Sequence, residues 1–440
     1  GPIESGEIDF NDLKGINLII GKNNTGKTYL SNLLYSYFKV RERQNIKKRE
    51  VVSFRLTKEL SDLDYEVIKH YYEKKYENEI KNILSQVFHT QKNSFEDFEI
   101  EVDLSDEILE FKKLDDYVII CFKELEKTIK LKKMQNKIEY VIEDYNEEKG
   151  KRYITYKSEI IEEEAKQFTF DYFLHIKFFQ KIYKIHSFPA ERSGAVLFYK
   201  QLLEERSDVL RELELGNSEN IGKISRYSEP VNDYVKFLNS ISDRSKGLTE
   251  LDIYKKLDTE LKEILGGEVI IDLEGNIMFR MNEKKIIDIG MVSSTVKTLT
   301  GFYLYLKYFA MERDIIFIDE IELNLHPENQ RKIMKLINYL SKQGIKFIIS
   351  THSPIITEEI DNMLLFEKVK DKINSEEMKE YGINSEYGLK TSDINVFHLH
   401  NKTVEKIKEK NGEFEIETFN TVLEETDNLY QTLLFYAEEK

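Results

Sequence analysis

The residues Gly21–Thr28 (GKNNTGKT) fit the pattern G-x-x-x-x-G-K-[ST] at every defined position. The apolar run INLII precedes them, and leucines at helical spacing follow. A glycine-rich turn between a strand and a helix directs backbone N–H groups inward, so it binds phosphate oxygens. We predict that Lys27 binds the β- and γ-phosphates of a nucleotide and that the Thr28 hydroxyl binds Mg²⁺. The predicted nucleotide-binding residues of this loop are Gly21, Asn23, Asn24, Thr25, Gly26, Lys27, Thr28 and Tyr29.

Two carboxylates follow a second apolar run, DIIFIDE at 314–320. Asp319 stands at the end of the expected strand and is predicted to hold the metal ion together with Thr28. Glu320 is predicted to act as the general base on the attacking water. The next apolar run, IKFII, leads into STHSP, and we expect His352 to hydrogen-bond the γ-phosphate or the same water. The predicted catalytic residues are therefore Lys27, Glu320 and His352.

Strand and helix patterns alternate around these motifs, which favours an α/β core with a largely parallel sheet. Short alternating runs at 96–157 predict a separate β-rich lobe, and a hairpin is expected at 268–281. The strands expected in the lobe are FEIEVDL, YVIICF, KIEYVIEDY and RYITYK, and the helices expected elsewhere cover 50–95, 159–181, much of 198–265, the segment VKTLTGFYLYLKYF and the segment PENQRKIMKLINYLSK.

Composition limits the function classes. The 440 residues are 40% apolar, enough for a buried core in about two or three lobes. The single cysteine, Cys121, excludes a disulfide framework and fits a reducing compartment. No run of about 18 apolar residues is present, so we expect a soluble cytoplasmic protein without a membrane contact. Whether the leading Gly-Pro is native stays open.

The net charge of −16 argues against a surface that binds nucleic acid everywhere. Lys39–Arg49 (KVRERQNIKKR) is the exception, with six positive charges and one negative charge. We expect any DNA contact to lie there. A solvated helix end is the alternative interpretation of this segment.

In their order, GKNNTGKT, FIDEIELNLHP and ISTHSP resemble the ATP-binding-cassette (ABC) ATPases of the SMC/RecF/OLD class. IELNLHP resembles the P-E-x-x-L-H-P loop of that class, with Ile321 in place of proline and Glu322 keeping the acid. FPAERSG at 188–194 resembles the PA-x-R-S segment of OLD-like members. The resemblance implies ATP and Mg²⁺ as cofactors and a P-loop ATPase head with a mostly parallel core sheet, an antiparallel β-lobe and helical insertions. Arg192 is then either a phosphate contact or a member of a buried ion pair.

Members of this class hydrolyse ATP between two heads, and each head covers the other's nucleotide with a serine at a helix N-terminus. The resemblance assigns this part to Ser293 or Ser294 in MVSSTV, where Thr295 replaces the usual glycine. It thus implies a homodimer or a higher homo-oligomer. Alternatively, the serines cap the helix.

Spacing separates the branches of the class. Residues 29–318 lie between the two main motifs, too many for a transporter motor and without the heptads of SMC arms. Residues 355–440 leave little room for the nuclease domain of OLD proteins. His398 and His400 are either a metal pair or part of a plain edge strand, and we favour the strand. The predicted domains are an N-terminal core part with the phosphate loop (1–50), a helical and β-rich insertion (51–182), a core strand (183–197), a helical subdomain (198–265), a C-terminal core part (266–354) and an α/β extension (355–440).

Three functions remain in view. The first is an ATPase switch that controls a separate effector, a nuclease or toxin, as in stand-alone bacterial anti-phage ATPase subunits of OLD-like type. The second is a RecF-like repair ATPase that clamps DNA. The third is an oligomeric scaffold locked by ATP with little hydrolysis. Glu320 argues against the scaffold, and Thr295 mildly supports it.

Overall fold

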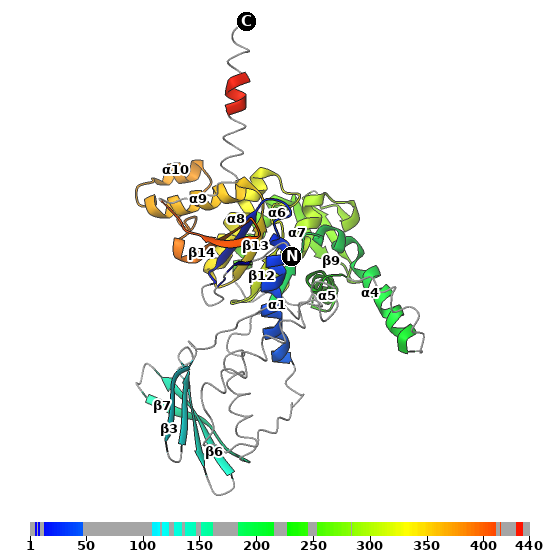
Figure 1. Ribbon diagram of the computed structural model, residues 1–440. Coiled ribbons are helices and arrows are strands. Elements are labelled where there is room, and N and C mark those ends of the chain that lie inside the picture. The colour runs from blue at the N-terminus through cyan, green and yellow to red at the C-terminus, as the bar shows by residue number, and fades with distance from the viewer. Residues whose placement is uncertain are drawn as a thin grey trace. The chain divides into compact units, whose positions relative to one another are not determined.

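The computed structural model divides the chain into two compact units, which we describe separately (Figure 1). The first unit comprises Gly1–Tyr35, Val87–His89 and Tyr183–Lys440, and the second comprises Ser36–Gln86 and Thr90–Ile182. The structure describes residues 5–6, 8, 13–46, 108–114, 117–122, 127–133, 137–146, 151–161, 184–214, 227–244, 253–282, 284–410, 414 and 428–433.

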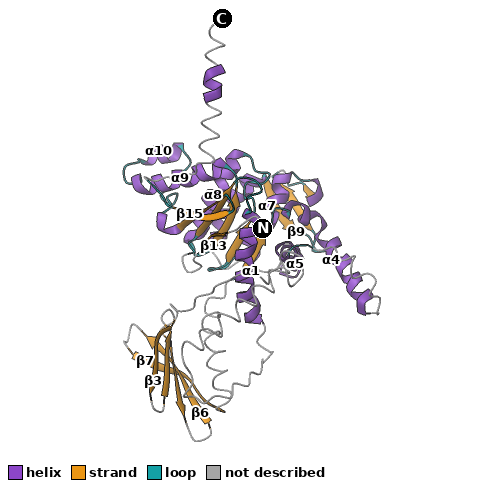
Figure 2. Cartoon of the chain, in the orientation of Figure 1, coloured by secondary structure: helices purple, strands orange, loops and turns teal. Residues whose placement is uncertain are grey.

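A seven-stranded sheet in the order β1-β15-β14-β2-β13-β12-β8 forms the centre of the first unit (Figure 2). The neighbours β14, β2, β13, β12 and β8 are all parallel, and β15 runs antiparallel to β14. The predicted α/β fold with a mostly parallel sheet is therefore confirmed. The strands are β1 (Ser5–Gly6), β2 (Ile16–Gly21), β8 (Ile185–Phe188), β12 (Ile315–Ile318), β13 (Lys346–Thr351), β14 (Ile394–His400) and β15 (Thr403–Ile407).

Helices and a small sheet surround this core. The small sheet is antiparallel and contains the expected hairpin, β9 (Gly267–Ile271) and β10 (Ile277–Met281), with β11 (Ile286–Asp288) beside it. The helices are α1 (Lys27–Ile46), α4 (Arg192–Glu214), α5 (Glu229–Arg244), α6 (Ile253–Leu265), α7 (Ser294–Tyr308), α8 (Pro327–Lys342), α9 (Pro354–Val369) and α10 (Ser375–Glu380), with short 3₁₀ turns η8 (Ile289–Met291) and η9 (Thr391–Asp393).

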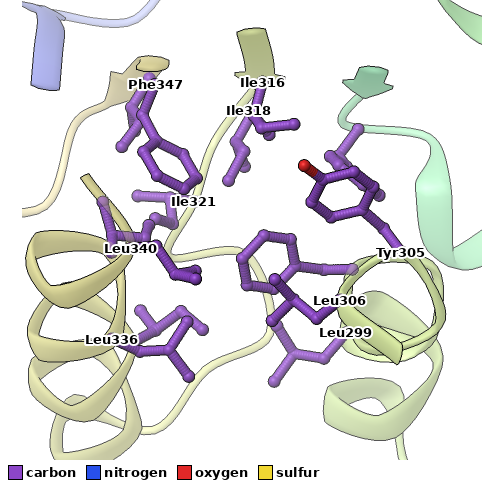
Figure 3. Close-up of a cluster of buried hydrophobic side chains, with 14 of the residues drawn as sticks. Leu299, Tyr305, Leu306, Ile316, Ile318, Ile321, Leu336, Leu340 and Phe347 are labelled. Carbon is purple, nitrogen blue, oxygen red and sulfur yellow. The ribbon is translucent and has the colours of Figure 1, made fainter. Parts of the chain in front are cut away.

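The central strands are mostly apolar and buried because helices cover both faces of the sheet. On one face, side chains from β12 and β13 pack against α7 and α8; Ile318, Leu306 and Leu340 lie in this cluster (Figure 3). Phe317 alternates with Ile318 and therefore faces the opposite side. There its ring contacts Tyr35 of α1, with 5.5 Å between the ring centroids.

Helix α7 continues through Gly301, as expected, although glycine weakens a helix interior. A Cβ atom at Gly301 would lie 2.2 Å from the hydroxyl oxygen of Tyr234 on α5. The absence of a side chain therefore lets α5 and α7 approach closely. Tyr234 is almost fully buried at this contact.

The parallel strands bring the predicted motifs together. β8, β12, β13 and β2 are neighbours in that order, so their carboxyl ends meet at one edge of the sheet. Pro189, Asp319, His352 and the loop that begins at Gly21 follow these four ends. Ligands bind at this edge in open α/β sheets.

The second unit contains a five-stranded antiparallel sheet in the order β3-β4-β5-β6-β7, which confirms the β-rich region. Strands β3 and β5 were not expected. Strand β7 still pairs with β6 at Ile161, so the helix expected from 159 is wrong at its start. Segments 50–95, 98–104 and 162–181 lie outside the described residues. The strands are β3 (Ile108–Leu114), β4 (Tyr117–Phe122), β5 (Lys127–Lys133), β6 (Lys137–Asn146) and β7 (Lys151–Ile161).

One carboxyl group is buried at the amino end of β12. Asp314 is 1% exposed, and it accepts hydrogen bonds from the Tyr305 hydroxyl at 2.8 Å and the Met311 N–H at 3.0 Å. Burial raises the pKa of Asp314 to about 6 in spite of these donors. The folded chain therefore keeps a proton on Asp314 at pH values where the unfolded chain has released it.

This shift predicts a pH-dependent difference in stability between the wild type and Asp314→Asn. Because the folded pKa lies above the ordinary value of 3.8, the folded state binds the extra proton between about pH 4 and pH 6. The carboxyl's contribution to stability is complete below this window and is lost as the pH rises through it. The wild-type minus variant free energy of unfolding should fall by about 2 kcal/mol from pH 4 to pH 7. Urea unfolding at each pH measures it, with the exposed Asp371→Asn as the control. A pH-independent difference would contradict the assignment.

Candidate functional site

The phosphate loop has a shape that requires its glycines. Gly21 has φ +156° and Gly26 has φ +106°. A Cβ atom on Gly21 would lie 2.7 Å from both the Leu399 carbonyl oxygen and the Thr25 Oγ1 atom. Thr25 Oγ1 donates a hydrogen bond of 2.8 Å back to the Lys22 carbonyl, which closes the turn.

Lys27 lies buried inside this turn at the first residue of α1. Its Nζ donates to the carbonyl oxygens of Gly21 and Lys22 at 2.8 and 2.9 Å. Burial lowers the pKa of Lys27, and the negative charges of Glu320, Glu322 and Asp319 oppose that change. Three acids from the β12 end thus act on one buried ammonium group.

Thr28 and Asp319 are in direct contact. The Thr28 hydroxyl donates a 3.0 Å hydrogen bond to Asp319 Oδ2. The other carboxylate oxygen, Oδ1, accepts a hydrogen bond from Ser350 Oγ on β13. Mg²⁺ prefers hard oxygen ligands of this kind, with the remaining positions filled by water and phosphate. The donor set therefore fits the predicted metal ion, and Thr28 and Asp319 are the residues that would hold it.

Glu320 has a left-handed backbone with φ +50°, a conformation that costs a residue with a side chain about 1 kcal/mol. Its N–H donates to Ser350 Oγ at 2.9 Å. Ser350 thus bonds to both residues that follow β12, yet its role was not apparent in the sequence.

Arg192, the first residue of α4, is 2% exposed. Its guanidinium donates to three backbone carbonyl oxygens, those of Pro189 at 3.0 Å, Asp319 at 2.5 Å and Glu320 at 2.7 Å. Burial lowers the pKa of Arg192. The described hydrogen bonds of Arg192 are thus with main-chain carbonyls rather than with an acid, and a contact with phosphate stays a prediction.

Glu322 links the loop after β12 to the end of β13. It accepts hydrogen bonds from Thr351 Oγ1 at 2.8 Å and from the His352 N–H at 2.7 Å. His352 Nδ1 also lies 3.0 Å from the same Glu322 oxygen. Glu322 is buried, whereas the His352 side chain is 40% exposed. The sequence motif contains Glu322, but only the contact with His352 gives it a role.

Ser293 and Ser294 are both exposed at the N-terminus of α7. Ser293 is the N-cap, and its hydroxyl accepts a 3.4 Å hydrogen bond from the Val296 N–H. Helix capping by Ser293 is therefore observed, and contact with a second copy's nucleotide stays a prediction. The Thr295 hydroxyl donates at 2.7 Å to the carbonyl of Asn324, which ties this helix end to the loop that follows Glu320.

Two further predictions concern the basic segment and the histidines of β14. Lys39–Ile46 of the basic segment belong to α1, and residues 47–49 lie outside the described residues. The edge-strand interpretation of His398 and His400 is wrong, because β14 pairs with β2 on one side and β15 on the other. In the described ranges, no group of three His, Cys, Asp or Glu residues is arranged to hold a metal ion.

Within the same ranges, no helix is both long and apolar enough to cross a membrane. A family model described as an AAA ATPase domain matches residues 1–357.

Solved structures of SMC heads overlap weakly with the chain. An SMC head bound to the C-terminal winged-helix domain of ScpA is 12% identical, with 92% of each chain covered and a TM-score of 0.33. A Pyrococcus furiosus SMC head bound to the C-terminal domain of ScpA is also 12% identical, covering 96% of this chain and 94% of that chain, with a TM-score of 0.29. The SMC head of Thermotoga maritima is 10% identical, covering 93% and 97%, with a TM-score of 0.26. Overlaps of this size carry no argument about function.

Proposed function

The chain belongs to the AAA ATPase domain family and is an ATPase, and we propose that it is an ATP-driven switch in which two copies close over bound nucleotide. The observation that carries the proposal is the contact between the two halves of the site. The Thr28 hydroxyl of the phosphate loop bonds to Asp319 at the end of β12 at 3.0 Å. Both motifs are thus assembled at one sheet edge, where ligands bind.

Each side chain has a part in hydrolysis. Lys27 neutralises negative charge on the phosphates, and Thr28 with Asp319 would hold Mg²⁺, which supplies further charge neutralisation to the transferring phosphoryl group. Glu320 accepts the proton of the attacking water. Glu322 contacts His352 at Nδ1, so Nε2 is the ring nitrogen that remains for the nucleotide or the water.

The second copy covers the bound nucleotide with the N-terminus of its helix α7. An exposed helix N-terminus carries partial positive charge and favours anions, and Ser293 and Ser294 add two hydroxyls there. The hydrogen bond from Thr295 to Asn324 joins this helix end to the loop after the proposed base. Closure over a γ-phosphate is therefore coupled to Glu320 in the copy that carries the serines.

The purpose of the switch is control of a separate effector. We propose that this effector is a separate protein, as the sequence resemblance implies. A nuclease or toxin of an anti-phage system is the effector that the sequence resemblance favours. In the regions 96–157 and 198–265, we propose the described strands and helices as the site of contact with such a partner.

Mixing two inactive variants tests the composite site. Lys27→Ala has intact serines, and the Ser293→Ala/Ser294→Ala variant has an intact phosphate loop. A mixed dimer contains one complete site, so an equal mixture should recover about a quarter of wild-type ATPase activity if sites act independently. Specific activity of the wild type should also rise with protein concentration until dimers saturate.

The control mixture pairs Lys27→Ala with a chain that carries all three substitutions, since no dimer in it has a complete site. Recovery in that control, or full wild-type activity in a strictly monomeric chain, would sink the two-copy proposal.

A further inference from the structure

Asp319 and Glu320, the two residues after β12, have all four of their backbone N–H and C=O groups hydrogen-bonded. The Asp319 N–H donates to the Phe188 carbonyl at 3.0 Å, and the Glu320 N–H donates to Ser350 Oγ at 2.9 Å. The two carbonyl oxygens, of Asp319 and Glu320, both accept from Arg192. Phe188 belongs to β8 and Ser350 to β13, so the strands on both sides of β12 take part.

Arg192 is unusual for a buried arginine because its hydrogen bonds are to backbone carbonyls, whereas a buried charge is normally paired with an acid. Among the described residues, no carboxylate lies within ion-pair distance of Arg192, and its contacts are the carbonyls of Pro189, Asp319 and Glu320. The planar guanidinium spans two consecutive carbonyls with two different nitrogens, Nη1 and Nη2. An ammonium group, with a single nitrogen, lacks this fork geometry.

The held segment is also the strained one. Glu320 has φ +50°, a left-handed conformation that is unfavourable for a residue with a side chain, so the surrounding contacts must fix it. The direction of the Glu320 side chain depends on this backbone setting. Arg192 contacts the carbonyl of that same residue at 2.7 Å.

We propose that Arg192 is a positioning residue for ATP hydrolysis, which sets the backbone of Glu320 and makes no contact with the nucleotide. The proposal rests on the role of Glu320 as the base given above. The contact with Pro189 anchors the guanidinium to the end of β8. The base is thereby aligned by the turn between β8 and α4.

The test is Arg192→Lys, which keeps the positive charge and loses the pair of nitrogens that donate to the two consecutive carbonyls. Because misplacement of a catalytic group lowers the rate without weakening ATP binding, kcat should fall by about 10- to 100-fold. KM and the Kd for MgATP, measured by equilibrium binding, should stay within about twofold of the wild type. Arg331→Lys is the matched control, since Arg331 is held by Glu359 at 2.6 Å on α9, and its kcat should not change.

A double-mutant cycle with Glu320→Gln separates this inference from the proposed function. If Arg192 acts through Glu320, then adding Arg192→Lys to Glu320→Gln lowers kcat no further. A wild-type rate in Glu320→Gln alone would remove the proposed base. A slow Glu320→Gln with an independent, multiplicative effect of Arg192→Lys would overturn only the positioning role.

A large rise in the Kd for MgATP with unchanged kcat would also overturn it, because Arg192 would then be a phosphate contact. Thermal unfolding checks that each variant is folded. If Arg192→Lys is unfolded at the assay temperature, Arg192→Gln takes its place, since its amide keeps two N–H donors. The same kcat, Kd and double-variant outcomes then decide.

Discussion

Glu320→Gln should bind MgATP with about wild-type affinity and hydrolyse it roughly 10²-fold more slowly or worse. The amide keeps the size of the side chain and loses only the ability to accept a proton. The backbone contacts that hold this residue, from Ser350 and Arg192, do not involve its side chain and should persist. Phosphate release under saturating MgATP measures the rate, and equilibrium binding measures the affinity.

Glu328→Gln is the matched control for that experiment. Glu328 lies at the start of α8 with its side chain 66% exposed, and it pairs with Lys332 at 2.7 Å on the surface. Turnover in this variant should equal that of the wild type. If Glu320→Gln also turned over normally, another group would have to be the base.

Lys27→Ala should weaken MgATP binding by roughly 10- to 100-fold or more, since hydrogen bonds to charged groups contribute about 1.5 to 3 kcal/mol each. The loss has two parts. The phosphates lose their cation, and the acids Asp319, Glu320 and Glu322, which now act on Lys27, are left to repel them. Titration of the variant with MgATP measures the effect.

Lys22→Ala is the control within the same loop. Lys22 contributes its backbone carbonyl to the turn, and its exposed side chain has no part in the proposed chemistry. MgATP affinity should therefore stay near that of the wild type. Equal binding by Lys27→Ala and the wild type would remove Lys27 from the phosphate site.

Individual strands and helices could be predicted from the sequence where the pattern that indicates them is local. The runs before Gly21 and Asp319 are short, apolar and bounded by turn residues, and both are buried strands in the structure. Helix α8 begins at Pro327, as a proline in the first turn predicts. The mostly parallel direction of the strands followed from the alternation of strand and helix patterns rather than from any one residue.

Prediction was poor where a role depends on a distant partner. Arg192 lies 127 positions from Asp319 in the sequence. No sequence pattern predicts that the Arg192 guanidinium donates a hydrogen bond to the backbone carbonyl of Asp319. Ser350 reads only as the end of a buried strand. The motif IELNLHP singled out Glu322 as an acid. Its contacts with Thr351 and His352 become apparent only when the neighbouring strands β12 and β13 are placed side by side.

Strand β14 shows a different limit. His398 and His400 alternate with apolar residues on one strand face, and because the sequence offers no third metal ligand beside them, a plain edge strand was favoured. Strand β15, which pairs with the outer side of β14, is a short charged segment, TVEKI, whose few apolar residues do not predict a strand by themselves. Sheet position is thus a property of two segments and cannot be read from one.

The site's assembly from separated strands also has a kinetic consequence. The hydrogen bond between Thr28 and Asp319 joins positions 291 apart, and the one between Arg192 and Glu320 joins positions 128 apart. Contacts of such long sequence separation form slowly, because loop-closure entropy must be overcome first. During synthesis, the phosphate loop emerges before β12 and β13 and has no metal-holding partner until these strands have been added. The complete nucleotide site therefore forms only after β12 and β13 have been made.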